Sequence, residues 1–274
     1  KAKITRMETT PLVIPLRLPT LTIVVKRWTR TCCSPSRIDP ANILRLLLPT
    51  MFKLILFDID GTLIRTGGAG VKAFGKTFQE EYQLPHATES LSFAGRTDRR
   101  LVELLFSQND IEITPTAVER FFEVYLGHLE HFLPKDHTTP LEGVIELIDS
   151  MGKWQPTPVI GLLTGNHPQG AQLKLNHYNL WHEFEMGVFG DKHLDREAVA
   201  EEALVWARDR WDDINPEQIL IIGDTHRDIQ CAQSIGAKVL AVATGDSTVT
   251  ELQEHNPDWT SQDLTAKNIP DLSV

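Results

Sequence analysis

Four short apolar runs divide the sequence, and each run ends in small, polar or acidic residues. These runs are residues 52–57, 158–163, 218–222 and 238–243. Continuous apolar runs of this length are typical of parallel strands that are buried on both faces of a sheet. Apolar residues recur every three to four positions in residues 168–178, 196–210 and 227–235, as in amphipathic helices. This alternation predicts an α/β fold with a doubly wound parallel sheet, whose ligand site lies at the carboxyl ends of the strands.

The stretch after the first apolar run breaks this alternation. It contains three successive helical patterns with no clear strand between them, over residues 69–82, 97–109 and 115–132. We predict a helical cap over residues 67–139 and a catalytic core made of residues 51–66 and 140–274. A cap inserted directly after the first strand is placed to act as a lid over that strand's carboxyl end.

The first 50 residues differ in composition from the rest of the chain. They hold nine Lys or Arg residues, only two acidic residues and six prolines, without sustained periodicity. We expect residues 1–50 to be a basic extension that is disordered or not native, with Met51 as the natural start. An organelle-targeting peptide is the alternative.

Composition also excludes several partners. The chain carries a formal net charge of −10 despite its basic start, so the part after residue 50 is strongly acidic and should repel nucleic acid. No run approaches the roughly 20 apolar residues of a membrane helix. The cysteines Cys32, Cys33 and Cys231 are too few and too unevenly placed for a disulfide framework, which favours a reducing compartment and a cytoplasmic protein. The oligomeric state does not follow from the sequence.

Carboxylates follow two of the predicted strands. Asp58 and Asp60 come directly after the first, and Asp224 and Asp228 follow the third. Phosphate monoesters hydrolyse very slowly unaided, so an enzyme needs an aligned nucleophile, charge neutralisation and a proton donor. One acid of the first pair can attack while the other transfers protons. The second pair offers oxygen ligands to a hard divalent cation, for which we expect Mg²⁺.

A further polar cluster follows the second predicted strand. Thr164, Gly165 and Asn166 offer a hydroxyl group and amides at the start of the helix that begins near Pro168. Such groups stabilise phosphoryl oxygens.

These motifs, in this order, resemble the haloacid dehalogenase superfamily of aspartate-nucleophile phosphatases. The resemblance covers residues 52–264 and rests on the D-x-D-G-T-L signature at 58–63, on Thr164, and on the G-D-x-x-x-D motif of Asp224 and Asp228. It implies a Rossmann-like core with a cap and a Mg²⁺-dependent phosphatase acting on small phosphorylated metabolites.

The resemblance also implies roles for individual residues. Asp58 is then the nucleophile that forms an aspartyl-phosphate, and Asp60 is the general acid and base. The metal is held by Asp58, the carbonyl of Asp60 and Asp224, with Asp228 as a further candidate ligand. The dehalogenases and the phosphonate-cleaving members lack an aspartate at the motif position that Asp60 occupies here, so phosphoryl chemistry is favoured.

One feature of the family pattern, the cation that neutralises the phosphate, leaves alternatives open. The family's usual Lys-Pro pair is absent, so the cation that neutralises the phosphate is Arg196 or Lys192, and we expect Arg196.

The insert resembles the helical cap of phosphoglycolate-phosphatase-like members. Residues 95–98 resemble the substrate-facing loop of that cap, with Arg96 as a candidate substrate contact.

Residues 70–77 match a competing motif, the P-loop pattern G-x-x-x-x-G-K-S/T. A P-loop directly joins a strand to a helix, whereas this match begins 12 residues after Asp58 and has helical spacing. We interpret it as an amphipathic cap helix. A P-loop kinase or NTPase, a phosphomutase and a catalytically silent binding protein remain the alternatives to a phosphatase.

Overall fold

A computed structural model of the chain describes residues 52–133 and 139–272. The predictions for residues 1–50 lie outside the described residues, as does the end of the predicted cap at residues 134–138.

A six-stranded parallel sheet forms the centre of the described fold, in the order β3-β2-β1-β4-β5-β6. The strands are β1 (Leu54–Phe57), β2 (Val159–Leu163), β3 (Met186–Val188), β4 (Ile219–Gly223), β5 (Lys238–Val242) and β6 (Trp259–Ser261). Strand β1 lies between β2 and β4, with Phe57 opposite both Leu162 and Ile222. The chain extends the sheet first to one side of β1 and then to the other, and ligands bind at such a switch point in open α/β sheets.

Helices cover both faces of this sheet. They are α5 (Val144–Met151), α6 (Pro168–His177), α7 (Arg196–Arg210), α8 (His226–Ile235) and α9 (Val249–Gln253). Successive side chains of a strand point to opposite faces, so Ile55 and Phe57 pack in one hydrophobic cluster with α5 and α6. Leu54 and Leu56 pack in the other cluster with α7 and α8. The predicted doubly wound α/β fold is confirmed.

Among the described α-helices and strands of the core, four were not predicted from the sequence. Strands β3 and β6 have three residues each, and α9 has five, so these segments are too short to display a period. Helix α5 is longer, but it begins after Gly143, which has a left-handed φ of 86° and provides no side-chain cap. It therefore lacks the usual start signal of a helix.

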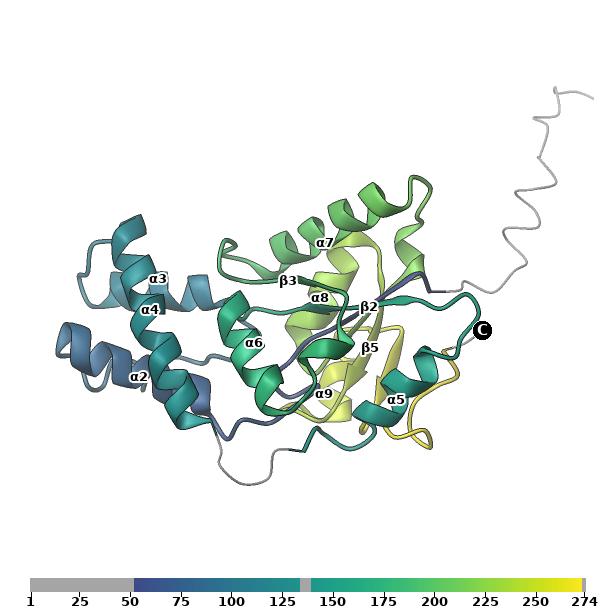
Figure 1. The fold of residues 1–274 in the computed structure, drawn as a ribbon, viewed down its shortest axis with the longest axis horizontal. Helices are drawn as coiled ribbons and strands as arrows, with labels where there is room; N and C mark the ends of the chain where they lie inside the picture. Colours follow the sequence, from purple (N-terminus) through teal and green to yellow (C-terminus); the bar gives the residue numbers. More distant parts are fainter. Residues whose placement is uncertain (1–51, 134–138, 273–274) are drawn as a thin grey trace, which may run out of the picture. The chain divides into compact units, whose positions relative to one another are not determined.

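Between β1 and β2 the chain forms α2 (Ala69–Tyr82), α3 (Asp98–Gln108) and α4 (Pro115–Phe132), which are grouped together in Figure 1. We call these three helices, with the loop of residues 83–97, the cap. The cap has its own core of aromatic side chains, including Phe74, Phe78, Phe106 and Phe121. Thr97 and Thr114 accept hydrogen bonds from backbone N–H groups and cap the starts of α3 and α4. The three predicted helices are confirmed.

The P-loop-like residues 70–77 lie inside α2. Its Lys76 pairs with Glu80 one turn later, at an Nζ to Oε1 distance of 2.9 Å. The interpretation of this segment as a helix is therefore confirmed.

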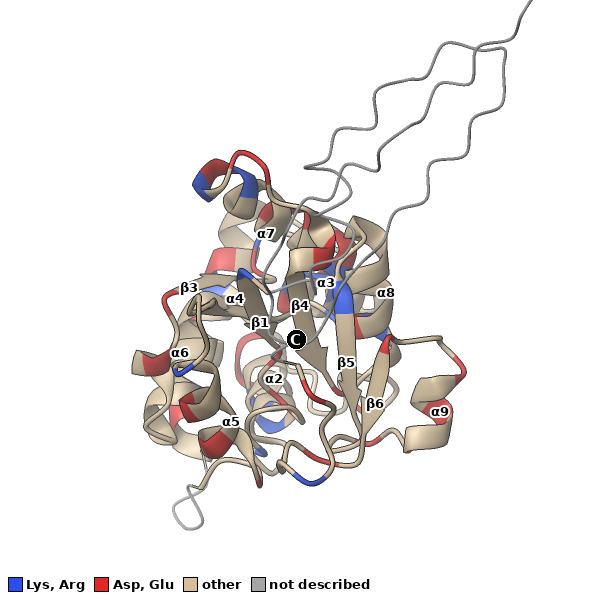
Figure 2. Cartoon of the chain, turned by 90° about the vertical axis from the view of Figure 1, so that its right-hand side faces the viewer, with Lys and Arg blue, Asp and Glu red and all other residues tan. Residues whose placement is uncertain are grey.

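Acidic residues occur on several helices of the core, including α5, α7 and α9 (Figure 2). Among the described residues, no helix is both long and apolar enough to cross a membrane.

Candidate active site

Asp58 and Asp60, the first acidic pair, directly follow the end of β1. The N–H of Asp58 donates a hydrogen bond of 2.9 Å to the carbonyl of Ile222, so Asp58 continues the strand by one residue. The backbone then turns at Gly61, which has a φ of 88°. A side chain at Gly61 would clash with the carboxylate of Asp224, so this turn requires glycine both for its backbone angle and for the close approach of that carboxylate.

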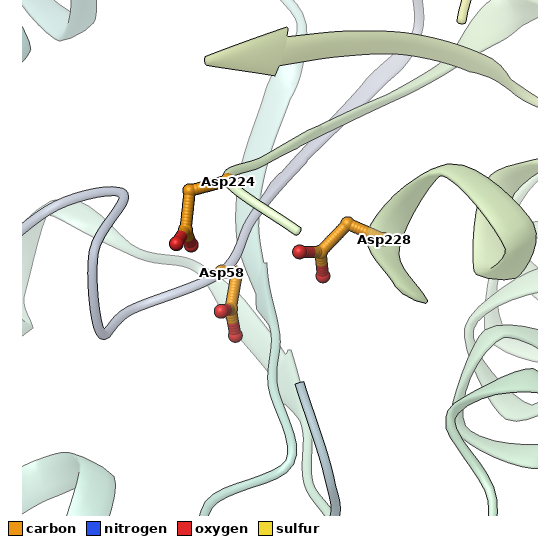
Figure 3. A group of neighbouring side chains, drawn as sticks. All are labelled: Asp58, Asp224 and Asp228. Atoms are coloured by element: carbon orange, nitrogen blue, oxygen red, sulfur yellow. The ribbon is translucent and has the colours of Figure 1, made fainter. Parts of the chain in front are cut away.

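Three buried carboxylates meet at this edge of the sheet (Figure 3). Asp58, Asp224 and Asp228 each place one oxygen within 4.8 Å of the others. Burial, partly offset for Asp58 by the Arg196 charge, and the neighbouring carboxylates raise the pKa of Asp58 to about 6 and that of Asp224 to about 8. A site with this excess of negative charge and only oxygen donors fits a hard divalent cation such as Mg²⁺.

Arg196, the first residue of α7, lies beside these acids. Its Nη1 donates to Asp58 Oδ1 at 3.1 Å and its Nη2 contacts Asp228 Oδ1. Burial alone would lower the pKa of Arg196, but the negative charges of Asp58 and Asp228 raise it overall. Lys192, the alternative cation, is exposed and does not line the cavity described below. The structure therefore brings Arg196, and not Lys192, to the acidic pair.

Asp228 is fully engaged by protein groups. Its Oδ2 accepts hydrogen bonds from the N–H of Thr225 at 3.0 Å and from the Thr225 hydroxyl at 2.7 Å. These contacts form the capping box that starts α8. With Arg196 on its other oxygen, Asp228 is positioned to orient Arg196 and the helix.

The polar cluster after β2 contacts Asp60. Asn166 Nδ2 donates to Asp60 Oδ2 at 2.9 Å and to the hydroxyl of Thr164 at 2.8 Å. Gly165 packs so closely on the cap that a side chain there would overlap the carbonyl oxygen of Arg96. All three predicted residues of this cluster line the same cavity as Asp58.

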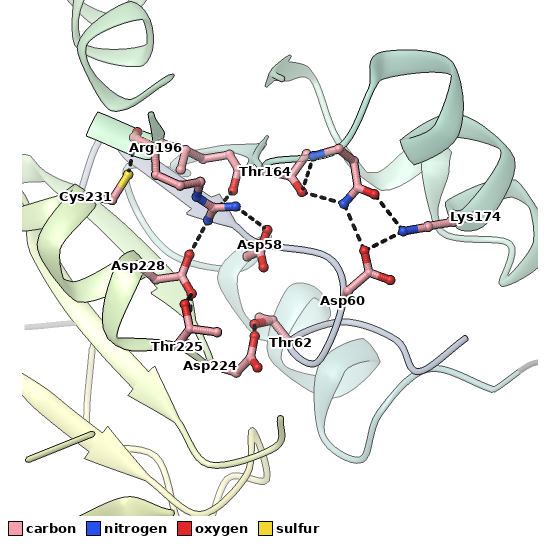
Figure 4. A network of polar contacts seen from close by, with 12 residues as sticks. Asp58, Asp60, Thr62, Thr164, Lys174, Arg196, Asp224, Thr225, Asp228 and Cys231 are labelled. Carbon is pink, nitrogen blue, oxygen red and sulfur yellow. Dashed lines mark hydrogen bonds and ion pairs between the residues drawn. The ribbon is translucent and has the colours of Figure 1, made fainter. Parts of the chain in front are cut away.

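Lys174 of α6 is a member of the site that the sequence analysis missed. Its Nζ donates to Asp60 Oδ2 and to Asn166 Oδ1, each at 2.6 Å, and only 3% of the residue is exposed (Figure 4). The sequence did contain a signal, because Lys174 lies on the buried face of α6 beside Ala171 and Leu175. A lysine on the buried face of an amphipathic helix, where an apolar residue is expected, needs a buried polar partner.

The loop before α3 and the first residue of that helix, Asp98, attach the cap to the core. The N–H of Asp98 donates to the carbonyl of Gly165, and the carboxylate of Asp98 accepts from the N–H of His167, both at 2.7 Å. Burial raises the pKa of Asp98 to about 6. Arg96, on the same loop, lines the cavity next to the core residues.

A cavity of about 430 Å³ lies where these groups converge. Its core wall includes Asp58, Asp60, Arg196 and Asp224, and its cap wall includes Val71, Phe74, Arg96 and Tyr125. This volume is within the range of small-molecule sites. The arrangement provides a nucleophile, a second acid, a cation and a place for a metal around a space for a small ligand.

Comparison with known proteins identifies similar chains. The family model described as haloacid dehalogenase-like hydrolase matches residues 55–242. A phosphoglycolate phosphatase of Agrobacterium fabrum is 23% identical over 78% of this chain and 89% of its own length. The pyrophosphatase PpaX of Bacillus mycoides is 29% identical over 75% of this chain and 90% of its own length.

Solved structures share the fold. A hydrolase from Pseudomonas syringae superposes with a TM-score of 0.60 at 20% identity, covering 78% of this chain and 95% of that protein. CbbY from Rhodobacter sphaeroides, in complex with phosphate, superposes with a TM-score of 0.59 at 16% identity, covering 79% and 96%.

Proposed function

Because this chain belongs to the haloacid dehalogenase-like hydrolase family, we propose that it is a Mg²⁺-dependent phosphatase of small phosphorylated metabolites. The observation that carries the proposal is the contact of the buried Asp58 carboxylate with Arg196, beside Asp224. A nucleophile, a charge-neutralising cation and a metal-binding carboxylate are then within reach of one phosphoryl group.

In the first step, an oxygen of Asp58 attacks phosphorus and forms an aspartyl-phosphate while the bond from phosphorus to the leaving oxygen breaks. Asp60 donates a proton to that leaving oxygen, so the product departs as an alcohol. Arg196 neutralises negative charge on Asp58 and the phosphoryl group. The hydroxyl of Thr164 and the amide groups of Gly165 and Asn166 hold the phosphoryl oxygens that do not react.

In the second step, Asp60, now a carboxylate, takes a proton from a water molecule that attacks phosphorus. The bond between phosphorus and Asp58 breaks, which releases phosphate and restores both acids. Lys174 and Asn166 contact the same oxygen of Asp60, at 2.6 and 2.9 Å. We assign them the task of keeping that carboxyl group in place through both proton transfers.

A bound Mg²⁺ would be held by Asp58, Asp224 and the carbonyl of Asp60, and would supply positive charge to the phosphoryl oxygens. Asp228 has both oxygens occupied by Arg196 and Thr225. We therefore place Asp228 beside the metal's ligands, as the group that orients Arg196.

The size and walls of the cavity support a small substrate. The cap residues Phe74, Arg96 and Tyr125 face the core across a cavity of about 430 Å³. A macromolecular phosphoester would have to displace the cap, whereas a metabolite fits beneath it. The names of the curated relatives, a phosphoglycolate phosphatase and a pyrophosphatase, point to the same substrate class.

The proposal is tested by hydrolysis of p-nitrophenyl phosphate by the full chain, with and without Mg²⁺. We expect Mg²⁺-dependent turnover that falls by more than about 1000-fold in Asp58→Asn, because that variant lacks the attacking carboxylate. Lys76→Ala is the matched control, since Lys76 pairs with Glu80 on the cap and does not line the cavity, and it should retain full activity.

Other outcomes would contradict the proposal in different ways. Loss of activity in Lys76→Ala but not in Asp58→Asn would indicate a P-loop enzyme. Absence of turnover by the folded protein in Mg²⁺ would indicate a mutase with a narrow substrate range or a silent binding protein.

A further inference from the structure

A second cavity lies next to the first, at the seam between the cap and the core. It has a volume of about 230 Å³ and is formed by the loop before α3, the first turns of α3 and α7, and the start of α8. We call it the seam cavity. Arg96, Arg100 and Arg227 line it, and Arg96 also lines the first cavity.

These three arginines lack acidic partners among the described residues. The Nε atoms of Arg96 and Arg227 are buried without any hydrogen-bond partner. Burial lowers the pKa of Arg96, and the charges of Arg227 and Arg100 lower it further. Like charges gathered in this way are unfavourable unless an anion joins them.

Several arginines elsewhere in the described chain have acidic partners. Arg99 pairs with Glu103, Arg120 with Glu81 and Arg210 with Glu185, at distances of 2.6 to 3.0 Å. The chain has 37 acidic residues against 27 Lys and Arg, so carboxylates are plentiful. The seam cavity nevertheless gathers three arginines without acidic partners among the described residues, two of them with a buried, unpartnered Nε.

The two acidic residues that line the seam cavity do not neutralise the charge of its three arginines. Asp195 and Glu197 are exposed, and neither forms an ion pair with the three arginines within the described residues. Arg196 also lines the cavity, but its guanidinium already contacts Asp58 and Asp228. Asp195, the residue before α7, forms no side-chain cap, so the first N–H groups of that helix remain available to an anion.

The cluster joins the cap to the core. Arg96 and Arg100 belong to the cap, whereas Arg227 belongs to α8 of the core. The backbone of Gly95, with a φ of 65°, packs directly on Arg227, because a Cβ atom at Gly95 would lie 2.6 Å from Arg227 Cδ. Arginines from the cap and from the core therefore line one cavity.

We propose that the seam cavity binds a phosphate-like oxyanion between Arg96, Arg100 and Arg227. Guanidinium groups bind such anions by paired, charge-assisted hydrogen bonds. An anion bound there contacts the cap and the core together and so stabilises the docked cap. The oxyanion is either free phosphate or a second anionic group on the substrate, and the two sources share this chemistry.

Equilibrium dialysis of the full chain against radiolabelled phosphate tests the site. We expect the double variant Arg100→Ala/Arg227→Ala to bind one phosphate fewer per chain than the wild type. Arg208→Ala is the matched control, because Arg208 is an exposed arginine of α7 away from the cavity, and it should bind as many as the wild type.

A second variant protects the test against misfolding. Arg100 is exposed, so Arg100→Ala should fold normally and weaken one class of phosphate binding by at least about fivefold. Equal phosphate binding by the wild type and both variants would overturn the proposal. Because the result is a difference of one site, it does not depend on whether the first cavity also binds phosphate or has phosphatase activity.

Kinetics of the double variant then distinguish the two sources. If the substrate supplies the anion, KM for phosphoglycolate should rise at least about tenfold, while KM for p-nitrophenyl phosphate, which has a single anionic group, stays unchanged. If free phosphate is the ligand, the two KM values should change in parallel or not at all. Either kinetic result identifies the source of the anion only when dialysis of the double variant also shows the loss of one bound phosphate.

Discussion

At the level of single residues, Lys174 has two polar partners in a place where helices normally bury apolar side chains. Its ammonium group joins Asp60 and Asn166, which come from two different strand ends. A buried charge is tolerated only when its partners satisfy it, so the position of Lys174 also determines the positions of those partners. In the proposed mechanism, the partner that matters is the acid that transfers protons.

We predict that Lys174→Met lowers kcat for p-nitrophenyl phosphate by about 10- to 100-fold, because Asp60 loses the contact that orients it. KM should change little, since Lys174 is assigned no contact with the phosphoryl group. Steady-state kinetics with Mg²⁺ measure both values, and Lys174→Arg should restore part of kcat.

Lys76→Met is the matched control, because Lys76 is a half-buried helical lysine that does not line the cavity, and its kinetics should equal those of the wild type. A Lys174→Met variant that raised KM at constant kcat would show that Lys174 acts on substrate binding instead.

At the level of elements, the site is shaped by docking of the cap loop (residues 83–97) and the start of α3 on the loops that follow β2 and β3. Backbone hydrogen bonds join Asp98 to Gly165 and Arg99 to Gly190. Contact at this point is so close that Gly165 has no room for a side chain. The cap is thus held against the site by backbone contacts.

We predict that Gly165→Ala lowers kcat/KM by about tenfold or more, because the added methyl group pushes the cap loop away from the phosphoryl-binding residues. Gly127→Ala in α4 is the matched control, since a Cβ atom there meets nothing within 4 Å. Ala also favours a helix over Gly by about 1 kcal/mol, so Gly127→Ala should keep its activity and lose no stability. Equal kcat/KM values for the two variants would contradict a close docking of the cap.

At the level of the whole molecule, the buried acids link stability to pH and to the metal. The pKa values of Asp58 and Asp224 rise from an ordinary 3.8 to about 6 and about 8 in the folded protein. The folded state therefore binds more protons than the unfolded state between about pH 4 and pH 8. Without a metal, the contribution of these groups to stability is lost as the pH rises through that range.

We predict that the increase in melting temperature on adding Mg²⁺ is several-fold larger at pH 8 than at pH 5, because Mg²⁺ binds the deprotonated carboxylates of the folded state. Thermal unfolding at both pH values, with and without Mg²⁺, measures the effect. Asp224→Asn should lose most of the gain at pH 8. An equal effect of Mg²⁺ at the two pH values would contradict a metal site at these acids.

Local patterns in the sequence were enough to place most of the fold and part of the site. The predicted helix over residues 196–210 is the observed α7, and the first strand was located to within two residues. Strand and helix periods depend on near neighbours, which is why they can be read without a structure. Asp58, Thr164 and Asp224 could be grouped in advance because parallel strands end at a common edge.

The tertiary structure alone decided which distant side chains meet. Lys174 contacts a residue 114 positions away, and Arg196 rather than Lys192 reaches Asp58 across 138 positions. The unpaired arginines of the seam cavity likewise come from the cap and from α8. Such contacts depend on how whole elements pack and on where buried charges find partners, and no local period in the sequence encodes either.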